Sequence, residues 1–160
     1  MVLCASAAAP GLWWTDVTTT QRLGNLVQVA YSPPLVPVGN GSSPGEPAGF
    51  LFSVAATPFD HELWFTDGTA SGTRLASDAR PGELGIEPTH LLALESAPIV
   101  VFRGADDFGR ELWSSDGTPS GTVRRTDIAP GAASSEPTPL GAQGRWLLLS
   151  ANDGTSGVEP

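Results

Sequence analysis

A 21-residue phrase occurs twice in this 160-residue chain and constrains its fold more than any other feature. The first copy, ELWFTDGTASGTRLASDARPG, runs from Glu62 to Gly82, and the second, ELWSSDGTPSGTVRRTDIAPG, runs from Glu111 to Gly131. The copies are identical at 12 of the 21 positions and begin 49 residues apart. A fixed period of this length is typical of repeat proteins, in which each repeat forms one supersecondary unit that stacks on its neighbours.

Weaker traces of the same repeat flank the two clear copies. The segment GLWWTDVT at 11–18 shares five residues with ELWFTDGT, although Val17 replaces the glycine, and ANDGTSGVE at 151–159 matches the lead-in to a further copy. The expected organisation is therefore an N-terminal tail or signal remnant at 1–10, a partial first repeat (its last two strands) at 11–31, a second repeat with a Pro/Gly-rich loop at 32–82, a third repeat at 83–131 and the truncated start of a fourth at 132–160.

Each repeat is predicted to form four short antiparallel strands. In the third repeat they fall at 91–95, 99–103, 111–115 and 122–127, and in the second at 35–38, 50–55, 62–66 and 73–78. The flanking segments add pairs at 11–16 and about 23–31, and around Leu140 and 146–151. Asp-Gly and Ser-Gly provide the hairpin turns, and helical periodicity is absent. The predicted fold class is all-β: four-stranded antiparallel sheets arranged like the blades of a β-propeller, incomplete and open, with about three blades.

The repeated phrase is predicted to have a structural role. Strand alternation places Leu63 and Leu112 on one face and Trp64 and Trp113 on the other, and each tryptophan can bury ~150–250 Å² between adjacent sheets. The positions that both copies share and that we assign to this structural motif are Glu62, Leu63, Trp64, Asp67, Gly68, Thr69, Gly72, Thr73 and Asp78 in the first copy, and Glu111, Leu112, Trp113, Asp116, Gly117, Thr118, Gly121, Thr122 and Asp127 in the second.

The phrase E-L-W-x-x-D-G-T, followed by S-G-T and D-x-x-P-G and later by S-A-N-D-G-T, resembles the ELWxxDGT repeat family of bacterial secreted and surface proteins. The resemblance covers most of residues 11–160 and is most specific at 62–82 and 111–131. It implies a β-propeller-like repeat protein and an extracellular or cell-surface location. It implies little about activity, because the molecular role of the family is poorly defined.

Composition limits the partners. The net charge is −9, with eight arginines and no lysine, which argues against a nucleic-acid partner and against anionic membrane surfaces. No run of apolar residues approaches the ~20 needed to span a membrane. Cys4 is the single cysteine, so no internal disulfide can form. The expected partners are a protein or a glycan bound through loops, or further blades supplied by self-association or by the same protein.

Acidic turns raise the alternative of a calcium site. Calcium takes six to eight oxygen ligands, and Asp-rich turns can supply them. No copy has the spacing of a complete calcium loop, so capping of the turns by their own aspartates is the favoured interpretation. The weak calcium candidates are Asp67, Asp116, Asp106, Asp107, Asn152 and Asp153.

No catalytic or cofactor-binding residue is predicted. Paired carboxylates can act as general acid and base, but Glu62 and Glu111 recur with the repeat, whereas a catalytic pair occurs once per active site. His61 and His90 have no metal-binding or nucleophilic companion nearby. The favoured function is a non-enzymatic structural or binding module, for adhesion or interaction. The alternatives are a fragment of a propeller enzyme acting on carbohydrate, or a gene fragment with no independent function.

Overall fold

The computed structural model describes residues 13–15, 20–22, 35–39, 48–57, 60–80, 84–94, 97–144 and 146–159. Every regular element in these ranges is a β-strand, which confirms the all-β prediction. None of the described residues forms a helix of the length and apolar character that crossing a membrane requires. The predicted tail at 1–10, the predicted strand at about 23–31 and most of the Pro/Gly-rich loop lie outside the described residues.

Two four-stranded sheets form the centre of the described structure, and in both each strand pairs antiparallel with the next one along the chain. The first sheet contains β3 (Val36–Val38), β4 (Gly49–Thr57), β5 (Asp60–Thr66) and β6 (Arg74–Ser77). The second contains β7 (Thr89–Ala93), β8 (Val100–Asp106), β9 (Gly109–Ser115) and β10 (Val123–Arg124).

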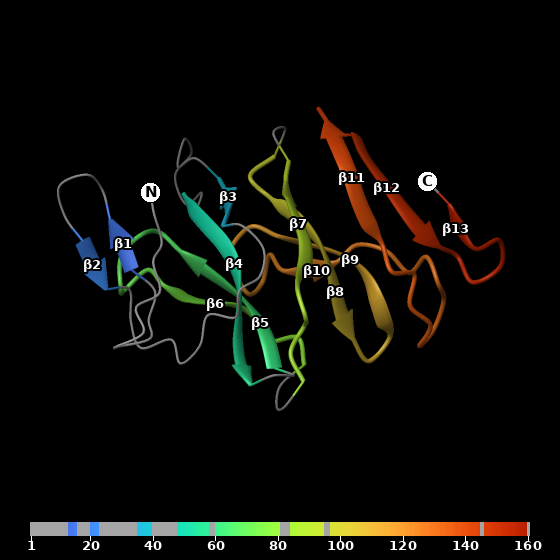
Figure 1. The fold of residues 1–160 in the computed structure, drawn as a ribbon, viewed down its shortest axis with the longest axis horizontal. Coiled ribbons are helices and arrows are strands. Elements are labelled where there is room, and N and C mark those ends of the chain that lie inside the picture. The colour runs from blue at the N-terminus through green and yellow to red at the C-terminus, as the bar shows by residue number, and fades with distance from the viewer. Residues whose placement is uncertain are drawn as a thin grey trace.

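Two smaller sheets accompany them. A two-stranded sheet pairs β1 (Trp13–Thr15) with β2 (Thr20–Arg22), and a three-stranded sheet contains β11 (Thr138–Gln143), β12 (Trp146–Asn152) and β13 (Val158–Glu159). Figure 1 shows that the three larger sheets follow one another across the molecule in chain order. The first strands of successive sheets make contact, β3 with β7 and β7 with β11.

The strands predicted for the second and third repeats are present, with bounds shifted by at most three residues, and one strand is much shorter than predicted. The last strand of the third repeat covers only Val123–Arg124 rather than 122–127, because Thr126 and the following backbone turn toward Glu111 and leave the ladder. The short strand β13 was not predicted. Its two residues, Val158 and Glu159, occupy the place of the E-L-W strand that the sequence pattern leads into.

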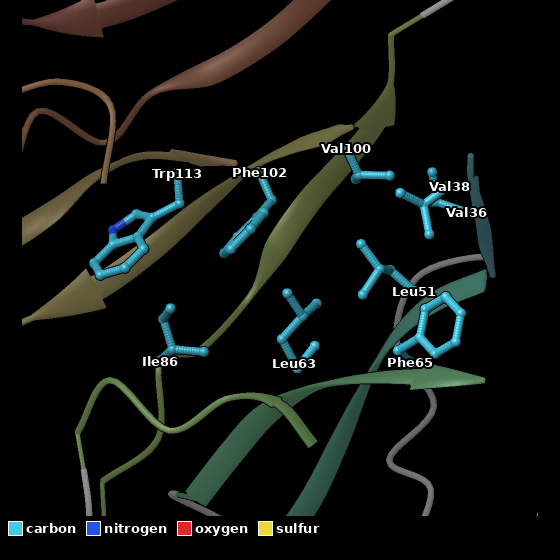
Figure 2. Packing of buried hydrophobic residues seen from close by; sticks show 10 residues of the cluster. Val36, Val38, Leu51, Leu63, Phe65, Ile86, Val100, Phe102 and Trp113 are labelled. Carbon is cyan, nitrogen blue, oxygen red and sulfur yellow. The ribbon is translucent and has the colours of Figure 1, made fainter. Parts of the chain in front are cut away.

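The core lies between the two four-stranded sheets. Leu51, Leu63 and Phe65 of the first sheet point toward Phe102 and Trp113 of the second (Figure 2). The Phe102 and Trp113 rings are stacked with their centroids 6.5 Å apart. The other members of the cluster are Val36, Val38, Ala76, Ile86 and Val100. Sheet-on-sheet burial of these side chains is the main source of stability in this part of the chain.

The alternation of leucine and tryptophan explains why the two copies contribute different residues to this core. Leu63 faces the second sheet from β5, whereas Trp113 faces the first sheet from β9. Trp64 and Leu112 therefore lie on the far faces of their sheets, and Trp64 is only partly buried. Of the two motif tryptophans, Trp113 alone fills the space between these sheets.

Candidate functional site

The Asp-Gly-Thr turn after β5 is held by its own side chains. The Oδ1 atom of Asp67 accepts hydrogen bonds from the backbone N–H of Thr69 at 2.8 Å and from its hydroxyl at 2.7 Å. The Thr69 hydroxyl in turn accepts the N–H of Gly72 at 2.9 Å. Partial burial raises the pKa of Asp67, but the donations from Thr69 outweigh it and hold that pKa below its usual value. The carboxylate is thus committed to closing the turn.

The turn after β9 repeats this network atom for atom. Asp116 Oδ1 accepts the N–H and the hydroxyl of Thr118 at 2.8 and 2.7 Å, and the Thr118 hydroxyl accepts the N–H of Gly121 at 3.0 Å. A Cβ on Gly121 would lie 2.1 Å from the Asp116 carboxylate, and one on Gly72 would be 2.0 Å from that of Asp67. This packing explains why the aspartate of D-G-T recurs together with the glycine of S-G-T, since only a glycine leaves room for the carboxylate.

The second turn also joins the two sheets. Gly117 lies so close to the ring of Phe65 that a Cβ there would approach it to 2.5 Å, and its carbonyl accepts a hydrogen bond from Arg74 at 3.1 Å. The Arg74 guanidinium lies 4.1 Å from the centre of the Phe65 ring. The Thr122 hydroxyl is 2.9 Å from the carbonyl oxygen of Ala76. The contacts of Gly117 and Thr122 thus connect the turn of one repeat to the strands of the repeat before it.

Glu111 is a buried carboxylate whose charge is matched by donors. It accepts hydrogen bonds from the Thr126 hydroxyl at 2.9 Å and from the N–H groups of Ile128 and Ala129 at 3.1 and 3.2 Å. Burial raises the pKa of Glu111, but the donors at Ile128, Ala129 and Thr126 outweigh it and hold the pKa below its usual value. Glu111 therefore fixes the segment that follows β10.

Glu62 occupies the same repeat position in different surroundings. It is 9% exposed, and its Oε2 atom is buried without a hydrogen-bond partner. Burial, followed by repulsion from Asp60 and Asp78, raises the pKa of Glu62 to about 8. Asp60 corresponds to Gly109 in the next repeat, so this extra charge is present in one copy only. Near neutral pH, the glutamate at this motif position is therefore protonated in the second repeat and ionised in the third.

The calcium candidates lie in separate turns, and most are held by the chain's own donors or by arginine. Asp106 accepts the N–H of Phe108 at 2.8 Å, and Asp107 lies 3.6 Å from the Arg80 guanidinium. Asn152 accepts the N–H of Gly154, and Asp153 accepts those of Thr155 and Ser156, which lower the pKa of Asp153. Across the described ranges, no three His, Cys, Asp or Glu side chains are arranged to hold a metal ion.

A second repeated motif, Glu-Pro-Thr at 87–89 and 136–138, was missed by the sequence analysis. Both glutamates have left-handed backbones, with φ of 50° and 47°. Arg110 joins them, through Nη2 to Glu87 at 2.6 Å and Nη1 to Glu136 at 3.4 Å, and Arg103 bonds Glu136 at 2.9 Å. The two Glu-Pro-Thr segments lie 49 residues apart, the same spacing as the longer repeat, and this spacing could have revealed the motif. The network ties the segment before β7 to the segment before β11.

The remaining motif acids and the histidines are dispersed. Asp127 pairs with Arg124 at 3.2 Å on the surface, and Asp78 is exposed after β6. The carbonyl oxygen of His61 accepts the N–H of Glu87. His90 is largely exposed, and its remaining burial, together with the charge of Arg103, lowers the pKa of His90. Of these groups, Asp78 lies close enough to Glu62 to raise its pKa. Asp127 and His90 contact neither Glu62 nor Glu111 in the described part of the chain.

Comparisons with family models, with curated proteins and with solved structures give no significant match. The features that distinguish this chain are two turns with one hydrogen-bond pattern and two glutamates whose pKa values shift in opposite directions.

Replacing Asp116 by alanine should lower the free energy of unfolding by about 1–2 kcal/mol, because Thr118 loses the acceptor for two donors. Urea denaturation measures the change, and Asp127→Ala serves as the control. Asp127 is exposed and makes one surface ion pair, so its loss should cost less than about 0.5 kcal/mol. Equal costs for the two variants, or a denaturation midpoint that depends on added calcium, would contradict the turn-capping role.

Proposed function

We propose that this chain is a non-enzymatic repeat module of a bacterial secreted or surface protein, related to the ELWxxDGT repeat family and built like part of a β-propeller. The observation that carries the proposal is the identical hydrogen bonding of the Asp-Gly-Thr turn in both copies. Asp67 and Asp116 cap their own turns through the same three hydrogen bonds. Both aspartates hold their turns through Oδ1 and recur with the repeat, unlike the residues of a single active site, so a structural role accounts for them.

The propeller-like arrangement is supported by the order of the sheets. Each four-stranded sheet is an antiparallel meander, and the first strands of successive sheets touch, as the inner strands of neighbouring blades do. The second turn rests on the strands of the preceding sheet at Phe65 and Arg74. None of the described sheets closes on itself, so further units would be needed to complete a ring.

The binding surface in this proposal is formed by the turn tips. Ala70 and Pro119 occupy the same position in the two turns, are exposed, and differ between the copies, while the flanking D-G-T and S-G-T residues are shared. Exposed hydroxyls lie beside them, at Ser71 and Ser120. Such groups suit a glycan, whose hydroxyls both donate and accept hydrogen bonds.

A glycan array tests this function. The chain should retain one or more glycans and release them intact, and the double variant Ala70→Arg, Pro119→Arg should bind at least about tenfold more weakly at an unchanged melting temperature. Ala132→Arg is the matched control, because Ala132 is also exposed but lies outside the two Asp-Gly-Thr turns. Cleavage of a bound glycan would favour the enzyme alternative, and the absence of any binding would contradict the glycan assignment.

A further inference from the structure

Glu62 and Glu111 hold the same position in the repeat but differ in the hydrogen bonds that reach them. Glu111 accepts the N–H groups of Ile128 and Ala129 at 3.1 and 3.2 Å, together with the Thr126 hydroxyl. Glu62 is 9% exposed, and its Oε2 atom is buried without a hydrogen-bond partner. A buried oxygen without a donor costs free energy, and the cost is largest once the carboxyl is ionised.

The second repeat contains the corresponding donors. Ala79 and Arg80 hold the positions of Ile128 and Ala129 in the D-x-x-P-G sequence that both repeats share. Both residues carry a backbone N–H, yet the Oε2 atom of Glu62 accepts a hydrogen bond from neither. The two repeats therefore differ in the path of the backbone after the last strand, and not in the donors that this backbone could offer.

That path separates at the end of the fourth strand of each sheet. Ser77 remains in the ladder of the first sheet, opposite Leu63. Its counterpart Thr126 has left the ladder of the second sheet, where the Thr126 hydroxyl accepts the N–H of Leu112 and donates to Glu111. The chain thus displays two arrangements of one repeated segment, one with the glutamate oxygen unpaired and one with it paired.

The charges that face Glu62 favour its protonated form. Asp60 lies on the same face of β5, and Asp78 follows β6. Burial, followed by repulsion from these two aspartates, raises the pKa of Glu62 to about 8, against the opposing effect of the N–H of Ile86. The residue opposite Glu62 on β4 is Val54, which is buried and apolar.

The nearby basic residues do not offset this repulsion. The guanidinium of Arg80 lies 3.6 Å from Asp107 of the next repeat. His61 neighbours Glu62 on β5, so strand alternation places it on the opposite face. Leu75 holds the position of Arg124, which in the third repeat pairs with the aspartate of the D-x-x-P-G sequence. The second repeat thus has more negative charge and less positive charge around its glutamate.

We propose that the segment after β6 is an element with two positions that is operated by the protonation of Glu62. While Glu62 is protonated, Ser77 pairs with Leu63. Once Glu62 is ionised, Ser77 leaves the ladder and the N–H groups of Ala79 and Arg80 donate to the carboxylate, in the arrangement that the third repeat already adopts. Because Arg80 also contacts the next repeat, the change alters the contact between the two repeats. This property belongs to the repeat itself and is independent of what the chain binds.

Amide hydrogen exchange of the full chain, resolved by residue with NMR between about pH 6 and 9, tests the proposal. Protection factors are compared, so that the intrinsic pH dependence of exchange cancels. Those of Ala79 and Arg80 should rise at least about tenfold as the N–H groups become bonded. The midpoint should be no higher than about 8, because the new donors favour the ionised carboxyl. The protection factors of Ile128 and Ala129 should not change, since Glu111 is ionised throughout this range.

Two isosteric variants separate this element from other effects of pH. Glu62→Gln cannot ionise, so the protection factors of Ala79 and Arg80 should be independent of pH in that variant. Asp60→Asn removes one repelling charge and should move the midpoint to lower pH. Constant protection in the wild type would overturn the proposal, as would a rise that persists in Glu62→Gln. A loss of protection throughout β5 and β6 would overturn it too, because it would indicate local unfolding instead of a second position.

Discussion

Exchanging Glu62 and Glu111 for glutamine, one at a time, should change the stability of the chain in opposite directions. Above about pH 8, Glu62→Gln is expected to raise the free energy of unfolding by roughly 2–4 kcal/mol, since each unit of pKa shift corresponds to ~1.4 kcal/mol. Glu111→Gln is expected to lower it by roughly 2–4 kcal/mol, because the amide presents an NH2 group to donors that the carboxylate satisfied. Urea denaturation at several pH values measures both.

The pH dependence of the two effects follows from the sign of each pKa shift. The pKa of Glu62 is raised from 4.5 to about 8 in the folded chain, so its contribution to stability is present below about 4.5 and is lost as the pH rises to about 8. The pKa of Glu111 is lowered, so its contribution is present above 4.5 and is lost as the pH falls below that value. A benefit of Glu62→Gln that did not grow with pH would contradict the burial of a carboxylate with one oxygen, Oε2, left without a hydrogen-bond partner.

Trp113→Ala should lower the free energy of unfolding by about 3–5 kcal/mol, because it leaves a cavity between the two four-stranded sheets. Trp113 is 6% exposed and stacks on Phe102 in the core cluster. Trp64→Ala should cost clearly less, since Trp64 is only partly buried and lies outside that cluster. Thermal or urea unfolding of the two variants gives the comparison.

The two tryptophans form a matched pair, since they hold the same place in the repeated phrase. A larger loss for Trp64→Ala than for Trp113→Ala would mean that the main core lies on the other side of the first sheet. Phe102→Leu is a useful third variant because it keeps the cluster apolar and should cost less than Trp113→Ala. If Trp113→Ala barely moved the unfolding midpoint, the packing in Figure 2 would be wrong.

The sequence was sufficient to predict the strands because the repeat carries its own turn signals. Asp-Gly and Ser-Gly recur at fixed offsets, and two side chains with hydroxyls complete each turn, so local chemistry determines where β5 and β9 end. The all-β class and the meander of the two central sheets follow from these local features.

The differences between the copies could not be predicted, because they depend on residues outside the shared positions. Glu62 and Glu111 hold the same position in the repeat, but their pKa values shift in opposite directions. Burial and Asp60 raise the pKa of Glu62, whereas the donors at Ile128 and Ala129 lower that of Glu111. The network around Arg110 was missed because its partners, Glu87 and Glu136, come from a motif that lies outside the ELWxxDGT phrase.

The contact of Gly117 with Phe65 and Arg74 depends on residues that the two repeats do not share. The next repeat carries Ser114 and Val123 in the places of Phe65 and Arg74, so the aromatic ring is absent there and the guanidinium beside Ser114 is that of Arg125 instead. The two repeats are therefore not interchangeable at this contact. Exchanging the two repeats, or duplicating only the third, would therefore place an Asp-Gly-Thr turn against strands that lack the Phe65 ring.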